Sequence, residues 1–550
     1  MDRLSPLDAS FLHIEDDVNL MHIGSVGIFE GPPPDPAEFR AMIEGKLPLV
    51  PRYRQRVREV PLSMGRPLWA EDPHFQLDYH VRHTALPGPG GRDELRNLVG
   101  RVMAQRLDRS KPLWELWVVE NVQGEQWAMV SKIHHALVDG ISGTDLLSVL
   151  LDGSPEPSPS VEDEWRPDSE PSELRLVAET VKDYALSPFE QWRVARSLVR
   201  RPVRLAKRVG GSVKGLPEMA DWARTRSSSV LVGRIGPHRR YAWTATTLDE
   251  IKTIRTALGG SVNDVVLSAV TRGFRDLLLA HGEDVEGRTV RTLVPVSVRQ
   301  EGDPAYANRV SAILAELPVG IEDPLERLAS LRAQMDKLKR SGEAVAAETL
   351  TSLSGFAPPL LLALGLRVAF RSAHRASRTP IETVTTNVPG PQQPLYALGR
   401  QMLTAYPYVP LASPIRVGVA IFSYVGRLTF GLTADRDSIE NLDVLAAGIE
   451  AGIAELLALA RDQSDPGDEG SARAGQTDGP ERSPARKKIT PQKKSAPKKK
   501  TTPTKKSASK KTTTRKKTAP KKRSSNRDTA SEDKVRAAVE QVKDAQSDEG

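Results

Sequence analysis

The residues with the clearest chemical potential lie together in one segment, His134-His135-Ala136-Leu137-Val138-Asp139-Gly140. A neutral imidazole can accept a proton from a hydroxyl group or an amine near pH 7, so either histidine could act as a general base. The carboxylate of Asp139 could hold the imidazole or brace the loop, and Gly140 leaves the entrance free of a side chain. A lone histidine at a strand end would be explained by simple burial, but the whole seven-residue pattern indicates a catalytic site.

The sequence before this segment predicts a β-hairpin that ends at the two histidines. We expect strands over residues 113–122 and 127–135, joined by a turn at Gln123-Gly124-Glu125. Side chains alternate between the two faces of a strand, so His134 points to one face. The other face then carries Trp127, Met129, Ser131, Ile133 and His135.

The His-His-x-x-x-Asp-Gly pattern resembles that of the chloramphenicol-acetyltransferase-like superfamily. Further motifs, in the same order, resemble the bacterial wax ester synthase/acyl-CoA:diacylglycerol acyltransferase family: LSPLDASF at 4–11, PLWE at 112–115, SVNDVVL at 261–267, VPVSVR at 294–299 and NVPGP at 387–391. The resemblance covers roughly residues 1 to 460 and not the tail. It implies an α/β fold with two chloramphenicol-acetyltransferase-like domains, each a mixed sheet with helices, and an active-site channel between them.

The resemblance also implies roles for the motif residues. His135 would be the general base that deprotonates the acceptor alcohol, His134 a supporting residue, and Gly140 would keep access to the channel. Asp139 would be structural, paired with an arginine, and Arg54 and Arg56 are both candidate partners. No covalent enzyme intermediate is needed, in agreement with a sequence that has no cysteine and no G-x-S-x-G motif.

We therefore expect an O-acyltransferase that moves a long-chain acyl group from acyl-CoA to diacylglycerol or to a long-chain alcohol. Acyl-CoA is a substrate, and no cofactor or metal ion is expected. The alternative is a catalytically idle scaffold of the same fold on a membrane or lipid droplet. The spacing of His134 and Asp139 also matches the core of the glycerophosphate acyltransferase motif, but the F-P-E-G-type motif that usually accompanies it is absent.

Two polar residues of the third motif, Asn263 and Asp264, are candidates for substrate binding. An amide or a helix N-terminus that faces the channel could stabilise a tetrahedral oxyanion. The Ser-x-x-Asp spacing from Ser261 is also a helix capping box, which requires no function. Asn387 and Pro389 are expected to shape a turn rather than to bind substrate.

Charge is distributed unevenly along the 550 residues, whose net charge is +8. Residues 471–550 hold 24 Lys and Arg against 9 Asp and Glu, which leaves residues 1–470 with a net charge of −7. The Lys-rich tail, residues 463–550, should be disordered because it cannot bury enough surface to offset its ordering entropy. Its charge favours contact with an anionic membrane or lipid droplet, and it could also bind DNA nonspecifically.

The rest of the chain predicts an N-terminal domain over 1–155, a linker and basic helical connection over 156–239, and a C-terminal domain over 240–462. The basic helix, residues 193–208, could be simply solvated or could rest on anionic lipid. The apolar segment 358–366 is expected to be buried or to line a tunnel. No signal peptide and no spanning apolar run is visible, so we expect a cytoplasmic protein that associates peripherally with a membrane or lipid droplet.

Overall fold

The computed structural model describes residues 2–61, 65–137, 149–186, 227–297, 310–341 and 381–464. The chain divides into two units, residues 1–464 and residues 465–550, and every described residue lies in the first. The predictions for the basic helix, the apolar segment 358–366 and residues 465–550 of the Lys-rich tail therefore fall outside the described residues. Residues 463 and 464, which were predicted to begin the disordered tail, are instead the last residues of a helix. None of the helices in the described ranges is long and apolar enough to cross a membrane.

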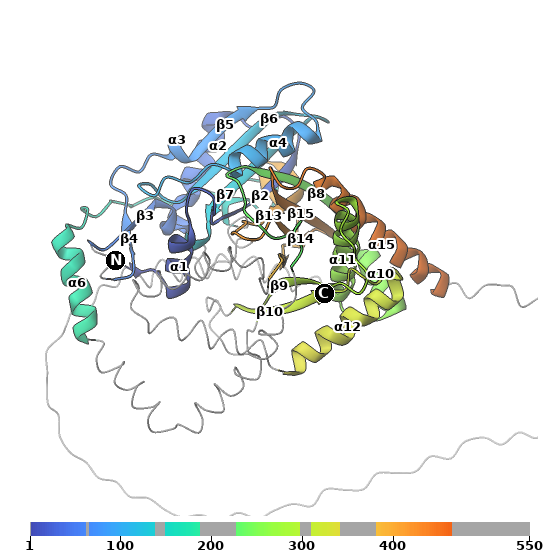
Figure 1. The fold of residues 1–550 in the computed structure, drawn as a ribbon. Coiled ribbons are helices and arrows are strands. Elements are labelled where there is room, and N and C mark those ends of the chain that lie inside the picture. Colours follow the sequence, from blue (N-terminus) through green and yellow to red (C-terminus); the bar gives the residue numbers. More distant parts are fainter. Residues whose placement is uncertain are drawn as a thin grey trace, which may run out of the picture. The chain divides into compact units, whose positions relative to one another are not determined.

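Two six-stranded sheets form the framework of the first unit (Figure 1). The first has the order β12 (Tyr396–Ala397), β13 (Arg400–Tyr408), β2 (His22–Glu30), β7 (Gln126–His134), β6 (Trp114–Val122) and β5 (Val81–Ala85). The second has the order β10 (Val310–Leu317), β9 (Val290–Ser297), β11 (Thr383–Pro389), β14 (Val417–Tyr424), β15 (Arg427–Asp435) and β8 (Arg239–Thr247). A small third sheet has the order β1 (Asp2–Arg3), β4 (Leu68–Glu71) and β3 (Gln55–Arg58).

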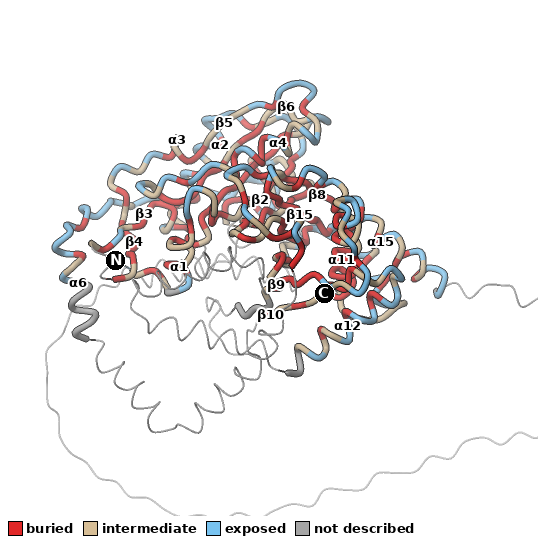
Figure 2. Tube along the Cα trace, in the orientation of Figure 1, coloured by how far each residue is buried: buried red, intermediate tan, exposed pale blue. Residues whose placement is uncertain are grey.

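Helices accompany these sheets and complete the α/β architecture. Those of the first half are α1 (Pro6–Ile14), α2 (Pro36–Lys46), α3 (Leu77–His80), α4 (Arg92–Met103) and α6 (Glu173–Leu186). Those of the second half are α10 (Leu248–Leu258), α11 (Val262–Ala280), α12 (Pro324–Ser341) and α15 (Leu442–Ser464). The short 3-10 helices are η1 (Leu47–Leu49), η2 (Pro51–Arg54) and η4 (His135–Leu137). Figure 2 shows that α11 is largely buried, and its apolar residues share one cluster with strands of the second sheet and with α15.

The predicted hairpin before the histidines is confirmed. Strands β6 and β7 pair antiparallel around the turn at residues 123–125. On β7, Trp127, Met129 and Ile133 join one apolar cluster, whereas Ala128 and Val130 join another that includes residues of α4. The alternation is therefore as expected, since successive side chains point to opposite faces.

The second half of the chain also supplies strands to the first sheet. Strand β13 pairs antiparallel with β2, so residues 396–408 leave the predicted C-terminal range 240–462 and join the sheet of the N-terminal range. At this seam a Cβ on Gly431 of β15 would lie 1.6 Å from the carbonyl oxygen of Pro407 in β13. Thr429 Oγ1 also donates a hydrogen bond to the carbonyl oxygen of Ala405 at 2.6 Å. The two sheets are thus joined through β13. Its pairing with β2 connects residues about 380 positions apart in the chain, which local patterns do not reveal.

Candidate active site

The alternation of side chains predicted that His135 is the last residue of the second hairpin strand. In the structure β7 ends at His134, and His135 is the first residue of the 3-10 helix η4. The next backbone N–H, that of Ala136, bonds to the side chain of His134 rather than to a neighbouring strand. The backbone N–H of His135 donates to the carbonyl oxygen of Met21 at 2.8 Å. Its imidazole stacks on the ring of Phe11 in α1, with the ring centroids 4.1 Å apart and the planes inclined by 25°.

Burial lowers the pKa of His135 to about 4 from its ordinary value of 6.5. A hydrogen bond to the residue's own backbone opposes this effect, and interaction with His134 adds to it. In the described part of the chain, no carboxylate forms an ion pair with this imidazole. The ring is therefore neutral at pH 7 and has a nitrogen lone pair available to accept a proton.

His134 points to the opposite face, as predicted, and is fully buried. Its Nδ1 accepts a hydrogen bond from the backbone N–H of Ala136 at 3.1 Å, so the neutral ring carries its proton on Nε2. That Nε2 lies 3.4 Å from Oε1 of Glu15, the residue that follows α1. The side chain of His134 therefore connects the start of η4 to the end of α1.

Glu15 is a buried member of the site that sequence reasoning missed. Burial raises its pKa, but contact with His134 and the positive charge of Arg109 outweigh this effect and lower the pKa to about 2. Arg109 donates from Nε to Oε2 of Glu15 at 2.9 Å and from Nη2 to the carbonyl oxygen of Leu12 at 2.6 Å. The carboxylate is consequently ionised and held in place. Nothing in the local sequence separates it from its neighbours Asp16 and Asp17.

Two further buried basic residues lie on the same face as His134. His22 is paired with His134 in the β2–β7 register, and its Nε2 donates to the carbonyl oxygen of Met103 at 2.6 Å. Burial, followed by the charge of Lys132, lowers the pKa of His22 to about 3. Burial likewise lowers the pKa of Lys132 to about 8, although Glu115 opposes this, and its Nζ donates to the carbonyl oxygen of Gln105. Both residues link the strands to the end of α4.

Asp139 and Gly140 lie outside the described residues, so their predicted roles are not tested. The two candidate arginines have other partners. Arg54 makes a two-pronged contact with the carboxylate of Asp163, and it lowers the pKa of that carboxyl group. Arg56 forms an ion pair with Glu170 at 2.8 Å. Both arginines thus anchor the segment that was predicted to be a linker.

Asp264 caps a helix. Its carboxylate accepts hydrogen bonds from the backbone N–H and the hydroxyl group of Ser261, both at 2.8 Å, so both halves of the predicted capping box are present. Asn263 instead accepts a hydrogen bond from Nδ2 of Asn387 at 3.4 Å. The prediction that Asn387 and Pro389 shape a turn is wrong, because both lie in β11, which pairs in parallel with β14. Among the described residues, neither asparagine amide forms a hydrogen bond with His135.

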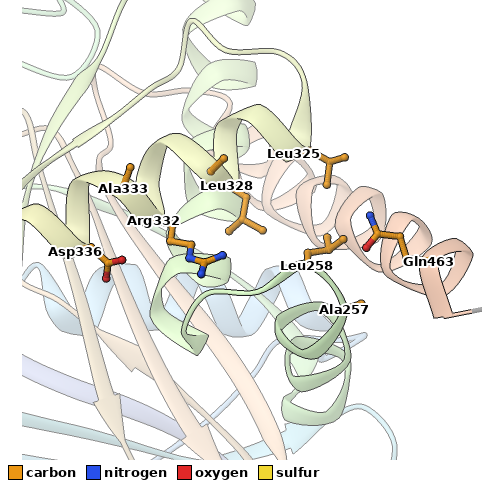
Figure 3. Close-up of a pocket in the computed structure, with 9 residues that line it drawn as sticks. Ala257, Leu258, Leu325, Leu328, Arg332, Ala333, Asp336 and Gln463 are labelled. Atoms are coloured by element: carbon orange, nitrogen blue, oxygen red, sulfur yellow. The ribbon is translucent and has the colours of Figure 1, made fainter.

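A hollow of about 680 Å³ lies elsewhere, between α10, α12 and the end of α15 (Figure 3). Apolar side chains such as Leu258 and Leu328 line it together with Arg332 and Asp336. No residue of η4 or of α1 takes part, so this hollow is separate from the histidine site.

Comparison with known proteins tests the resemblance independently. The wax ester synthase/diacylglycerol acyltransferase catalytic domain matches residues 4–266, and the C-terminal domain of the same family matches residues 306–457. A probable diacylglycerol O-acyltransferase of Mycobacterium tuberculosis (strain H37Rv) is 35% identical over 465 residues, which cover 84% of this chain and 97% of that protein. Both findings confirm the family predicted from the motifs.

Solved structures agree with the fold. The wax ester synthase/diacylglycerol acyltransferase from Marinobacter aquaeolei VT8 matches with a TM-score of 0.59 and 25% identity, over 84% of this chain and all of that one. The first condensation domain of the calcium-dependent antibiotic synthetase matches with a TM-score of 0.51 and 14% identity, over 84% of this chain and 97% of that one. The second match shows a shared fold and confirms the predicted fold class. The chain belongs to the wax ester synthase/diacylglycerol acyltransferase family, and it is an acyltransferase.

Proposed function

We propose that this protein transfers a long-chain acyl group from acyl-CoA to the hydroxyl group of diacylglycerol or of a long-chain alcohol, with His135 as the general base. The observation that carries the proposal is the neutral imidazole of His135, which stacks on Phe11 while the backbone N–H of the same residue donates to the carbonyl oxygen of Met21. The names of the relatives, diacylglycerol O-acyltransferase and wax ester synthase, support both acceptor classes.

In the proposed reaction the imidazole accepts the proton of the acceptor hydroxyl group, and the oxygen forms a bond to the carbonyl carbon of the thioester. The tetrahedral intermediate then collapses, the C–S bond breaks, and the imidazolium returns the proton to the departing CoA sulfur. Since a low pKa weakens a base, the imidazole must gain proton affinity in the transition state, when the oxyanion has formed. Asn263 could stabilise this oxyanion through its amide, while Asp264 contributes by fixing the start of α11.

The test offers diacylglycerol and hexadecanol in parallel to the full-length protein with palmitoyl-CoA, and measures CoA thiol release together with the lipid product. We expect His135→Ala to lower turnover by about 10²–10⁴-fold, because general-base assistance is lost. His74→Ala is the matched control, since that histidine is exposed. A folded His135→Ala protein with near-normal turnover would contradict the mechanism. Absence of turnover with either acceptor in the parent protein would favour the alternative, an idle lipid-droplet or membrane scaffold.

We further propose that the enzyme works at an anionic membrane or lipid-droplet surface, to which the Lys-rich tail attracts it. Each Lys or Arg near such a surface contributes about 1 kcal/mol, and this attraction weakens as salt screens it. Deletion of residues 471–550 should therefore abolish salt-sensitive flotation with phosphatidylserine vesicles while turnover on detergent-dispersed substrate persists. Retention of vesicle binding by the truncated protein would exclude the tail as the anchor. Salt-sensitive shifts of DNA by the full chain without vesicle binding would identify a nucleic-acid role instead.

A further inference from the structure

The end of helix α1 contacts the histidine pair at two points. Phe11 stacks on the imidazole of His135, and the carboxylate of Glu15 lies 3.4 Å from Nε2 of His134. The two residues are one helical turn apart, and the backbone N–H of Glu15 bonds to the carbonyl oxygen of Phe11 at 3.1 Å. This backbone hydrogen bond links the two contacts within one turn.

We propose that Phe11 and Glu15 are positioning residues for the general base, a role that rests on the function proposed for His135. Phe11 fixes the plane of the His135 imidazole directly. Glu15 acts through His134: its negative charge favours the tautomer with the proton on Nε2, which leaves Nδ1 free to accept the backbone N–H of Ala136. That hydrogen bond holds the first turn of η4, the element that carries His135.

The charged residues around Glu15 are consistent with this positioning role. Arg109 binds Oε2 through two nitrogens, at 2.9 and 2.7 Å, and Arg106 approaches the same oxygen at 3.4 Å. Oε1 has no arginine partner among the residues that the structure describes, and it faces His134. Lys132 also adds to the positive potential at the carboxylate, so the charge of Glu15 is well compensated. The arginines thus orient one oxygen and leave the other for the histidine.

Asp17 supplies a matched control two residues later in the chain. It also pairs with Arg106, at 3.4 Å, but its side chain is 96% exposed and no contact with a histidine is found among the described residues. Asp17→Asn removes a carboxylate charge near Arg106, as Glu15→Gln does. It leaves intact the contacts that run from Glu15 through His134 to η4. It should therefore leave turnover unchanged.

The experiment measures kcat and KM for palmitoyl-CoA in Glu15→Gln, His134→Asn and the double variant, all in the full-length protein. In His134→Asn the amide oxygen can take the place of Nδ1 and still accept from Ala136, but the side chain no longer reaches Glu15. We expect Glu15→Gln alone to lower kcat by about 10²-fold with KM nearly unchanged, as for a small misplacement of a reacting group. In the His134→Asn background the same change should cost nothing further, because the two residues act in series.

Phe11 is tested independently. Phe11→Leu keeps an apolar side chain but removes the stacked ring, so kcat should fall by about tenfold, and Phe11→Tyr, which restores the ring, should recover it. This pair also decides the proposal if Glu15→Gln fails to fold, because it leaves the carboxylate in place.

Any of three results would overturn the proposal. The first is a folded Glu15→Gln protein with parental kcat, and the second is losses from Glu15→Gln and His134→Asn that multiply in the double variant. The third is a folded Phe11→Leu protein with parental kcat. A parent protein without acyltransfer would instead refute the proposed function itself. The two failures are therefore distinguishable.

Discussion

Acidification should destabilise this protein through its buried histidines, and His80 and His22 are the clearest cases. His80 is 1% exposed, and its Nδ1 donates to the carbonyl oxygen of Trp114 at 2.8 Å. Burial lowers its pKa from 6.5 to about 4, and burial lowers that of His22 to about 3. Both histidines therefore stay neutral in the folded protein at pH 5, whereas in the unfolded chain they bind a proton below pH 6.5.

The sign follows from proton binding. The unfolded state binds more protons between the two pKa values, so the stability from each histidine is complete above pH 6.5 and is lost as pH falls below it. Each pH unit below 6.5 costs about 1.4 kcal/mol per histidine, so each contributes a loss of about 2 kcal/mol at pH 5. Glu15, with a pKa lowered to about 2, loses its contribution only below about pH 4.5 and does not interfere.

The assay is urea unfolding followed by tryptophan fluorescence at intervals from pH 5 to pH 7.5. His80→Asn keeps a donor for the carbonyl oxygen of Trp114, and His22→Gln keeps one for that of Met103, but neither side chain titrates. Each variant should reduce the loss of unfolding free energy between pH 7.5 and pH 5 by about 2 kcal/mol. His74→Ala, which removes an exposed histidine, should leave the pH dependence unchanged. Equal pH slopes in all four proteins would refute the reasoning.

Two further predictions concern packing and capping. Gly431→Ala should lower the free energy of unfolding by about 2–4 kcal/mol in urea titrations, because its Cβ would collide with the carbonyl oxygen of Pro407 and separate β13 from β15. The control is Gly153→Ala, where a Cβ meets nothing within 4 Å. It should change the free energy of unfolding by less than about 0.5 kcal/mol. Asp264→Ala should cost about 0.5–1.5 kcal/mol, because the backbone N–H of the N-cap residue Ser261 loses its carboxylate acceptor. A folded variant with parental stability but no turnover would show instead that Asp264 acts on the substrate.

Local sequence predicted those features that depend on neighbours in the chain. The β6–β7 hairpin follows from alternation and a turn with Gly124, whose φ of 91° favours glycine. The capping box of α11 follows from a spacing of three residues between Ser261 and Asp264. The opposite orientation of His134 follows from the period of a strand. In each case the residues that decide the structure lie within a few positions of one another.

Pairing between distant segments was beyond such patterns. Nothing in residues 396–408 shows that they join β2 rather than the sheet of their own half, because strands choose partners by burial and shape across the whole fold. The ion-pair partners of Arg54 and Arg56 could not be predicted from local sequence either. An arginine in a loop can pair with any carboxylate brought near it, and the structure brings Asp163 and Glu170.

Glu15 shows most clearly what the sequence determines and what the tertiary structure decides. The sequence Glu15-Asp16-Asp17 offers three adjacent carboxylates, and by itself it determines only that this short segment after a helix is acidic. Folding leaves Asp16 and Asp17 exposed but buries Glu15, where Arg109 and His134 lie beside its two oxygens. A buried carboxylate requires such partners, because removing a charge from water is costly unless it is paired. The sequence therefore determined which residues could do chemistry, and the tertiary structure decided which of them are placed where water is excluded and contacts are fixed.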